Sequence, residues 1–357
     1  MEAYKVIGIM SGTSLDGLDI ALCEFRKEGG KWNYHIIKGE TIEYTAQCRI
    51  EMNDLLYVKA EQLAFADMDF GYYIGGKVKD FLIKNNLKAD FIASHGHTIF
   101  HQPDEGFTYQ IGSGAAITAA SGLPVVSDFR SVDVALGGQG APLVPIGDKL
   151  LFTDFDYCLN LGGISNISFD KAGKRLAFDC CPVNIVLNAL AKEKRQEYDK
   201  DGLLARKGKV NNDLLEKLNK LDYYKQPFPK SIGKEWIDKE VFPIINAATG
   251  STEDKLATFC AHIAEQLKES ITASSGKLLA TGGGAFNCFL IEQIQQALPD
   301  IKVVVPDATI VSFKEALVFA FLGILRVRNE VNCLSSVTGA SADNIGGALY
   351  GNFSGLL

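Results

Sequence analysis

Short apolar runs typical of strands alternate along the chain with segments in which apolar residues recur every three or four positions. The first run, residues 5–10, leads through a short polar loop into a second run at 18–25, which predicts a hairpin. The same unit recurs in mid-chain, where residues 157–161 precede a small loop at 162–166. The alternation predicts an α/β protein, and the repeated hairpin suggests two related domains.

A third glycine loop has different surroundings. Residues 277–281 are typical of a strand, and the loop after them leads into a helix with one apolar face. Another helix is expected at 253–270, behind Ser251 or Thr252 as its cap. Residues 312–315 have capping-box spacing ahead of a run, 316–325, that is apolar on nearly all sides and should be buried.

Charge and composition narrow the class of protein. The net charge of −7 argues against a general polyanion-binding surface, so no nucleic-acid partner is expected. The apolar run at 316–325 falls short of the roughly 20 residues that a membrane-spanning helix needs. The N-terminus shows no signal-peptide pattern, and the eight Cys show no zinc spacing, which together predict a cytoplasmic protein without a membrane partner.

The three glycine loops are the strongest chemical signal in the sequence. Glycine lets backbone N–H groups approach phosphate oxygens closely, and Ser or Thr hydroxyls add donors. A carboxylate such as Asp16 could hold magnesium, which prefers oxygen ligands. Each loop taken alone could instead be a plain tight turn. Neither Walker spacing nor a GxGxxG after a strand occurs, so other phosphate-binding folds are disfavoured.

Several long motifs resemble one known family, the anhydro-N-acetylmuramic acid kinases. They are GIMSGTSLDGLDIAL (8–22), SHGHTIFHQP (94–103), DFRSVDVALGGQGAPLVP (128–145), LNLGGISNIS (159–168), TGGGAFN (281–287) and DATIVSFKEALVFAFLGIL (307–325). The likeness covers nearly the whole chain, and two of the strings, MSGTSLDG and GGQGAPLVP, are more specific than a general kinase signal.

The resemblance implies a two-domain actin-like fold of the ribonuclease H-like type, with an active-site cleft between the domains. We expect residues 1–145 with 320–357 to form one lobe and 146–319 to form the other. Members of the family open the 1,6-anhydro ring of a cell-wall amino sugar and phosphorylate its 6-hydroxyl, using ATP and Mg²⁺. The product is N-acetylmuramic acid 6-phosphate, in peptidoglycan recycling. The family also suggests a homodimer.

The resemblance also implies which residues bind the ligands. Candidate ATP contacts are Ser11, Gly12, Thr13, Ser14, Asp16, Gly162, Gly163, Ser165, Gly282, Gly283, Gly284 and Asn287, with Asp16 also the metal candidate. Candidate sugar contacts are His97, Thr98, Arg130 and Glu315. Alternatives remain for three of them: His97 could simply pack, Arg130 could pair with Asp128 or Asp133, and Glu315 could complete a capping box with Ser312.

Asp179 is the candidate catalytic base, because the family's catalytic Asp falls at this position. Judged by spacing alone it could be a helix N-cap instead. The segment 179–184 departs from the family's usual Asp-Thr-Gly-Pro-Gly-Asn and reads Asp-Cys-Cys-Pro-Val-Asn, which could reshape the substrate pocket. Cys180 and Cys181 are expected to be buried as small apolar residues, with a redox role as the less favoured alternative. Phe286 replaces a usual Arg in the adenosine loop.

Two other functions remain open at this point. The altered segment 179–184 would also suit an actin-like kinase for a related sugar. A catalytically silent nucleotide-binding regulator is the third possibility, although retention of Asp16 and Asp179 argues against it.

Overall fold

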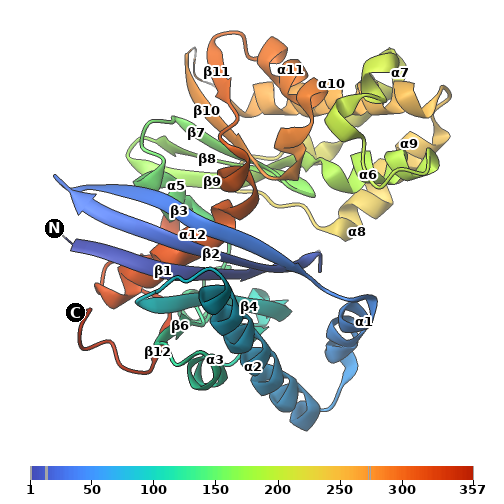
Figure 1. Cartoon of the computed structure of the whole chain (residues 1–357). Coiled ribbons are helices and arrows are strands. Elements are labelled where there is room, and N and C mark those ends of the chain that lie inside the picture. Colours follow the sequence, from blue (N-terminus) through green and yellow to red (C-terminus); the bar gives the residue numbers. More distant parts are fainter. Residues whose placement is uncertain (1, 13–14, 272, 274, 357) are drawn as a thin grey trace. The chain divides into compact units, whose positions relative to one another are not determined.

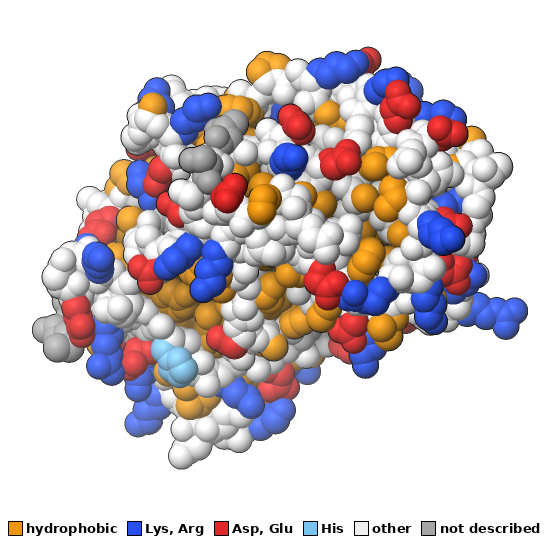
Figure 2. All heavy atoms as spheres, turned by 90° about the horizontal axis from the view of Figure 1, so that it is seen from above, with side chains coloured by type: hydrophobic (Ala, Val, Ile, Leu, Met, Phe, Trp, Pro, Cys, Tyr) orange, Lys and Arg blue, Asp and Glu red, His pale blue; other side chains and the backbone are white. Residues whose placement is uncertain are grey.

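The computed structural model describes residues 2–12, 15–271, 273 and 275–356 (Figure 1). The chain divides into two compact units, residues 1–151 with 313–357 (unit 1) and residues 152–312 (unit 2). On the face drawn in Figure 2, Lys and Arg side chains lie among Asp and Glu side chains. Among the described residues on that face, the basic side chains therefore do not form the continuous positive surface that binds polyanions.

Unit 1 is built on one mixed sheet with strand order β12-β6-β4-β1-β2-β3, with β5 paired to β4. Its strands are β1 (Glu2–Ser11), β2 (Gly17–Glu28), β3 (Lys31–Glu43), β4 (Phe91–Gln102), β5 (Phe107–Ile111), β6 (Val125–Ser127) and β12 (Ala348–Tyr350). Its helices are α1 (Ala46–Asp54), α2 (Ala60–Lys84), α3 (Gly114–Ser121), α4 (Ser131–Ala135), α5 (Val144–Leu151) and α13 (Ser335–Thr338). A core of apolar side chains from β1, β2, β4 and α2 fills one side of the sheet.

Helix α12 (Ala308–Val327) lies closely on this sheet from its middle onward. A side chain at Gly8 of β1 would come within 1.8 Å of the Ala316 carbonyl oxygen, so the close approach requires glycine there. The run 316–325 is almost entirely buried, as predicted. By length and composition α12 could cross a membrane, but 67% of its most apolar window is buried inside the structure, as in a core helix.

The predicted cap of this helix is wrong. Residues 312–315 lie inside α12, and the Asp307 carboxylate accepts the N–H groups of Thr309 and Ile310 at 2.9 and 3.1 Å. The helix therefore begins with an Asp cap five residues ahead of the predicted capping box, so Glu315 has no capping role. The cap predicted for α10 (Thr252–Ser270) is confirmed, because Ser251 Oγ accepts the Asp254 N–H at 3.1 Å.

Unit 2 contains a second mixed sheet with strand order β11-β10-β7-β8-β9. Its strands are β7 (Tyr157–Leu161), β8 (Ile164–Lys171), β9 (Lys174–Pro182), β10 (Gly276–Thr281) and β11 (Ile301–Val304). Its helices are α6 (Asn184–Glu193), α7 (Asn212–Asn219), α8 (Lys234–Trp236), α9 (Phe242–Ala247), α10 and α11 (Cys288–Ala297). A continuous core joins this sheet to α6, α10 and α11.

The two sheets share one topology. In each, three consecutive antiparallel strands are followed by two strands that run parallel to the first. In unit 1, β4 lies beside β1 and β6 beside β4; in unit 2, β10 lies beside β7 and β11 beside β10. This repeated order is the ribonuclease H-like arrangement of actin-like proteins, so the fold class predicted from the sequence is confirmed. It also explains why the hairpin pattern occurs twice along the chain.

Candidate active site

Two of the predicted glycine loops meet at one edge of the unit 2 sheet. Strands β7 and β10 are parallel neighbours, with Thr281 paired to Asn160, so the loops that follow them begin side by side. One is the turn Gly162–Gly163 and the other is Gly282–Gly284. Ligands of open α/β sheets bind outside the carboxyl ends of the strands, which makes this edge the candidate site.

Two positions in the second loop require glycine. Gly282 has φ +81°, and a Cβ there would lie 2.4 Å from Asn160 Oδ1. A Cβ at Gly284 would lie 2.9 Å from the Leu161 Cβ. The loop can therefore pack against the end of β7 only without side chains at these two positions, whereas Gly283 is exposed and an added Cβ there would lie 3.6 Å from Asn184 Nδ2.

The turn Gly162–Gly163 directs its carbonyl groups toward α6. Gly163 O accepts the Val183 and Ile185 N–H groups at 2.9 and 3.2 Å, and Gly162 O accepts the Asn184 N–H at 3.2 Å. Within the described part of the chain, the N–H groups of Gly162 and Gly163 donate to no acceptor. They are accordingly available to an oxyanion.

Ser165 does not extend this set of donors. Its side chain is 0% exposed, and its Oγ accepts the Cys181 N–H at 3.1 Å while donating to the Cys181 carbonyl at 2.9 Å. The hydroxyl bridges β8 and β9 beside a register shift between Ser165 and Asn166. Its role in this structure is to hold the two strands rather than to present a donor on the loop.

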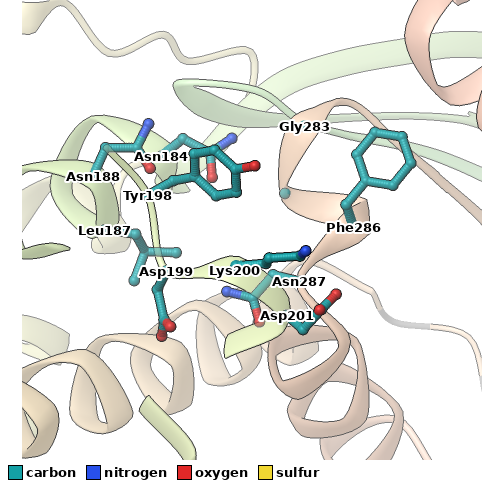
Figure 3. Close-up of a pocket in the computed structure, with 11 residues that line it drawn as sticks. Asn184, Leu187, Asn188, Tyr198, Asp199, Lys200, Asp201, Gly283, Phe286 and Asn287 are labelled. Carbon is teal, nitrogen blue, oxygen red and sulfur yellow. The ribbon is translucent and has the colours of Figure 1, made fainter. Parts of the chain in front are cut away.

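Beside the glycine loops lies a pocket of about 470 Å³ (Figure 3). Its lining residues are Asn184, Leu187, Asn188, Tyr198, Asp199, Lys200, Asp201, Gly283, Gly284, Phe286 and Asn287. Tyr198 and Phe286 lie on opposite sides of it, and their side chains are 56% and 46% exposed. Two open aromatic rings beside a glycine turn can stack a planar base while the backbone binds attached phosphates.

Asn287 has two roles at this pocket. Its Oδ1 accepts the Leu290 N–H at 3.0 Å, which caps α11 and fixes the side chain. The predicted pocket residues Gly283, Gly284 and Asn287 are thus brought together, whereas Tyr198, Lys200 and Asp201 were missed. These three follow α6 in a segment without a motif or periodicity, so no sequence signal pointed to them.

Asp179 lies within β9, not at a helix end. Strand β9 runs on to Pro182 and α6 begins at Asn184, so the N-cap alternative for Asp179 is wrong. Its Oδ2 accepts the Ile232 N–H at 3.0 Å, and the Tyr223 hydroxyl donates to its backbone carbonyl at 2.6 Å. Burial raises the pKa of this carboxyl to about 6, and the Ile232 hydrogen bond opposes that shift.

The altered residues after Asp179 face the core. Cys180 and Cys181 are 2% and 0% exposed, and Val183 is fully buried in the unit 2 core. Burial raises the pKa of Cys180 and raises that of Cys181 to about 12, so both thiols stay protonated. Their predicted burial as small apolar residues is confirmed. Asp179 and Asn184, which are partly exposed, keep the family's residues.

In unit 1, Ser11 and His97 lie side by side. Ser11, the last residue of β1, is paired with His97 in the middle of β4, and the Ser11 hydroxyl lies 3.0 Å from His97 Nδ1. The Tyr44 hydroxyl, which no motif singled out, donates to Ser11 Oγ at 2.8 Å. Burial lowers the pKa of His97, which keeps its ring neutral, and the three side chains form one hydrogen-bonded chain in which Tyr44 donates to Ser11.

Arg130 forms neither of the ion pairs considered from the sequence. Its Nε and Nη2 donate to His95 Nε2 at 3.0 and 2.8 Å, and its Nη1 donates to the Gly140 carbonyl at 2.6 Å. His95 therefore carries its proton on Nδ1, which donates to the Gly96 carbonyl at 2.9 Å. Burial and the Arg130 charge lower the pKa of His95, which keeps this acceptor neutral.

Asp133 instead lies at the centre of a buried hydrogen-bond network in unit 1. Its carboxylate is 0% exposed and accepts hydrogen bonds from the Gly140 N–H, the Thr338 hydroxyl and the Asn344 amide, each at 2.8 Å. The Cys333 thiol lies 3.0 Å from the same oxygen as Thr338. The carboxylate thus ties the loop after α4 to the C-terminal segment of unit 1.

The other candidate residues of unit 1 differ in how exposed they are. Asp16 is exposed, Gly12 and Thr98 are half-buried, and Glu315 is exposed on α12. Asp16 lies close enough to Asp19 to help raise the pKa of Asp19, whose main cause is burial. Carboxylate oxygens are ligands for divalent cations, which is the chemistry predicted for Asp16. Thr13 and Ser14 lie outside the described residues.

The likeness to known proteins extends over almost the whole chain. The family model for anhydro-N-acetylmuramic acid kinase matches residues 4–352. The kinase of this name from Pseudomonas fluorescens (strain Pf0-1) is 35% identical, with 97% of this chain and 99% of that protein covered. The one from Francisella tularensis subsp. novicida (strain U112) is 36% identical, with 96% and 97% covered.

The site and fold are those of an ATP-dependent carbohydrate kinase, the enzyme class that the sequence predicts. The chain belongs to the anhydro-N-acetylmuramic acid kinase family.

Solved structures show a more distant likeness. The activator of 2-hydroxyisocaproyl-CoA dehydratase from Clostridium difficile, with bound ADPNP, has a TM-score of 0.45 at 12% identity, with 88% of this chain and 92% of that chain covered. A ROK family glucokinase from Streptomyces griseus, in complex with glucose and AMPPNP, has a TM-score of 0.40 at 12% identity, with 89% and 98% covered. At these identities the likeness does not extend to function.

Proposed function

We propose that this protein uses ATP to open 1,6-anhydro-N-acetylmuramic acid with water and to phosphorylate its 6-hydroxyl. The product is N-acetylmuramic acid 6-phosphate, which would enter peptidoglycan recycling in the cytoplasm. The observation that carries the proposal is Asp179, a half-buried carboxyl whose pKa is raised to about 6 and which Ile232 positions. It lies on β9, the strand paired with β8, and β8 follows the Gly162–Gly163 turn.

The pocket of unit 2 is proposed to bind the nucleotide. Adenine would stack between Tyr198 and Phe286, and the free N–H groups of Gly162 and Gly163 would bind phosphate oxygens. Asp16 is proposed to hold Mg²⁺ directly or through water, and the metal would neutralise phosphate charge when bound. The sugar contacts are assigned to His97, Thr98, Arg130 and Glu315.

The base has a defined chemical task. Opening the anhydro bridge builds positive charge on the anomeric carbon, and water must lose a proton as it attacks there. The oxygen released from the bridge is the nucleophile toward the terminal phosphate of ATP. A carboxylate whose pKa is raised toward 6 is more basic than an ordinary Asp and is still ionised at neutral pH.

The pH dependence follows from this pKa. Asp179 acts only when deprotonated, so kcat should be constant above pH 7 and fall about tenfold per pH unit below about pH 6. An Asp with an ordinary pKa would hold the plateau down to about pH 5. Initial rates with saturating ATP and sugar from pH 4.5 to 8.5 measure the profile. A plateau that reaches pH 4.5 would contradict the assignment.

The aromatic pocket predicts a binding defect. Replacing Phe286 with Ala should raise KM for ATP by about tenfold with kcat within about twofold, because stacking on a base is worth roughly 1–3 kcal/mol. Phe286→Tyr, which keeps the ring, should restore KM. Phe107→Ala removes a similarly exposed ring in unit 1 and serves as the control. An unchanged KM in Phe286→Ala would remove this ring from the nucleotide site.

One assay separates the proposed function from its alternatives. The protein is incubated with Mg-ATP and either 1,6-anhydro-N-acetylmuramic acid, N-acetylmuramic acid or N-acetylglucosamine, and phosphosugar is measured. Turnover confined to the anhydro sugar supports the proposal. Turnover on another sugar only would favour the related kinase, and ATP binding without any turnover would favour the silent regulator. The core placement of Cys180, Cys181 and Val183 argues for the family substrate, since these altered side chains are buried.

A further inference from the structure

Three groups of Asp179 are held by one segment of unit 2. The Asp179 N–H donates to the Lys230 carbonyl at 3.1 Å, and the Ile232 N–H donates to its carboxylate at 3.0 Å. The Tyr223 hydroxyl donates to its backbone carbonyl at 2.6 Å. All three partners lie between α7 and α8, in residues 223–232, which we call the strap. The strap thus contacts the backbone N–H, the backbone carbonyl and the carboxylate of the proposed base.

The strap has little regular structure of its own. Beyond a 3₁₀ turn at its start, residues 226–233 form no helix or strand. Two aromatic side chains anchor it to the rest of unit 2. The Tyr224 hydroxyl forms a hydrogen bond of 2.9 Å with His262 Nε2 on α10, and Phe228 stacks on Phe178 of β9 with 5.1 Å between the ring centroids. Neither contact fixes the section after Phe228, from which two of the three hydrogen bonds to the base come.

The Lys230 side chain closes the strap on itself. Its Nζ donates to the carbonyls of Tyr223 and Tyr224 at 3.3 and 3.4 Å, and it lies 4.7 Å from the centroid of the Tyr223 ring. The side chain is half-buried, and burial lowers its pKa, because the ammonium group has exchanged part of its water for carbonyl oxygens and an aromatic face. These contacts join the section that binds Asp179 to the anchored start of the strap.

We propose that Lys230 is a positioning residue for the base: by tying the end of the strap to its start, it holds the Ile232 N–H against the Asp179 carboxylate. Its consequence for catalysis rests on the proposed function, whereas the contacts themselves do not. Lys230 acts through Asp179 and needs no contact with either substrate. Hydrogen bonds from a charged donor are stronger than neutral ones, so one ammonium group can hold two carbonyls of an irregular segment.

The Ile232 hydrogen bond also affects how basic Asp179 is. This bond lowers the pKa of Asp179, which burial raises to about 6. Besides the ammonium group of the strap, the ionisable neighbours are Tyr223, Cys180 and Cys181, whose pKa values burial raises, so they stay neutral up to pH 8.5. Loss of the strap contact should therefore raise the pKa of Asp179 further and move the acid limb of kcat to higher pH.

NMR of two labelled groups tests the positioning without any substrate. The protein is labelled with [¹³Cγ]Asp and [¹⁵N]Ile, and Asp179→Asn and Ile232→Val identify the two signals. In the wild type the Asp179 carboxyl should titrate near pH 6, and the Ile232 amide should follow the same titration because it donates to that carboxylate. In Lys230→Met the midpoint should rise by about half to one pH unit, and the Ile232 amide should no longer follow it.

Three further variants separate the contact from the charge. Lys230→Gln, which is one atom shorter, should behave like Lys230→Met, and Lys230→Arg, which keeps the charge and its donors, should restore both signals. Lys77→Met removes a half-buried Lys that lies 5.3 Å from the Tyr73 ring centroid in unit 1, and it is the control. A charge acting only at a distance would change the midpoint but leave the Ile232 amide following the titration, and that result would overturn the proposal.

Steady-state kinetics connect the contact to turnover. Lys230→Met should lower the plateau value of kcat by about tenfold, move the acid limb upward with the NMR midpoint, and leave KM for ATP within about twofold. A wild-type kcat profile in a variant that has lost the strap contact would also overturn the proposal. A wild-type protein that leaves the anhydro sugar unchanged would contradict the proposed function instead, and the NMR titration would still decide whether Lys230 positions Asp179.

Discussion

Replacing Asp179 with Asn should lower kcat by about a thousandfold while leaving the Kd for ATP within about threefold. A positioned general base contributes roughly 10²–10⁴-fold, and the amide cannot accept the proton of the attacking water. Asn can still accept the Ile232 N–H through its side-chain oxygen, so the local structure is kept. Steady-state rates and a nucleotide titration on the same preparation provide the two values.

Asp154→Asn is the matched control for this experiment. Asp154 is an exposed carboxylate of unit 2, in the segment before β7. Its loss should leave both kcat and nucleotide affinity near wild type. If Asp179→Asn turned over at the wild-type rate, the base would have to be a different group. If it lost ATP binding as well, Asp179 would be a binding residue rather than a base.

The second large effect is on stability. Asp133→Asn should lower the free energy of unfolding of unit 1 by about 3 kcal/mol. The amide has nearly the same volume, but it offers only one acceptor oxygen to the Gly140, Thr338 and Asn344 donors. Its NH₂ group would also face at least one of those donors in a site with no exposed area.

The two tryptophans allow the units to be followed separately. Trp32 is buried in unit 1 on β3, and Trp236 lies in unit 2. In a Trp236→Phe background, urea unfolding followed by fluorescence therefore reports on unit 1 alone. Asp104→Asn, an exposed carboxylate in unit 1, should change the midpoint little. A wild-type midpoint in Asp133→Asn would show that the buried network contributes nothing.

The fold could be predicted from sequence because its signals are local. Strand runs joined by small polar loops predict hairpins from neighbouring residues, and the Ser251 cap follows from spacing within one turn. The order of the strands in each sheet does not follow from neighbouring residues alone. It was predicted from the family resemblance that the long motifs carry. The cap of α12 was wrong because two sites had suitable residue types, and only the backbone shows that Asp307 precedes the first turn.

The site was predicted less completely, for a physical reason. Gly283 and Asn287 stand in a recognisable turn, but Tyr198 is brought to them only by the packing of the segment after α6. The hydrogen-bond partners of hydroxyl groups could not be predicted either. Ser165 follows a glycine turn like those that bind phosphate, yet its hydroxyl bonds to the backbone of Cys181 on the paired strand. Residue type indicates which chemistry is available, whereas tertiary pairing decides where each donor is used.

The most direct test of the proposed reaction follows the oxygen atoms. The protein is incubated with Mg-ATP and 1,6-anhydro-N-acetylmuramic acid in ¹⁸O-labelled water, and the phosphosugar and any inorganic phosphate are analysed promptly by mass spectrometry and ³¹P NMR. The account predicts one ¹⁸O on the anomeric carbon of the 6-phosphosugar and none in its phosphate. Label appearing in inorganic phosphate, with the sugar unchanged, would mean that water attacks ATP instead and would contradict the account.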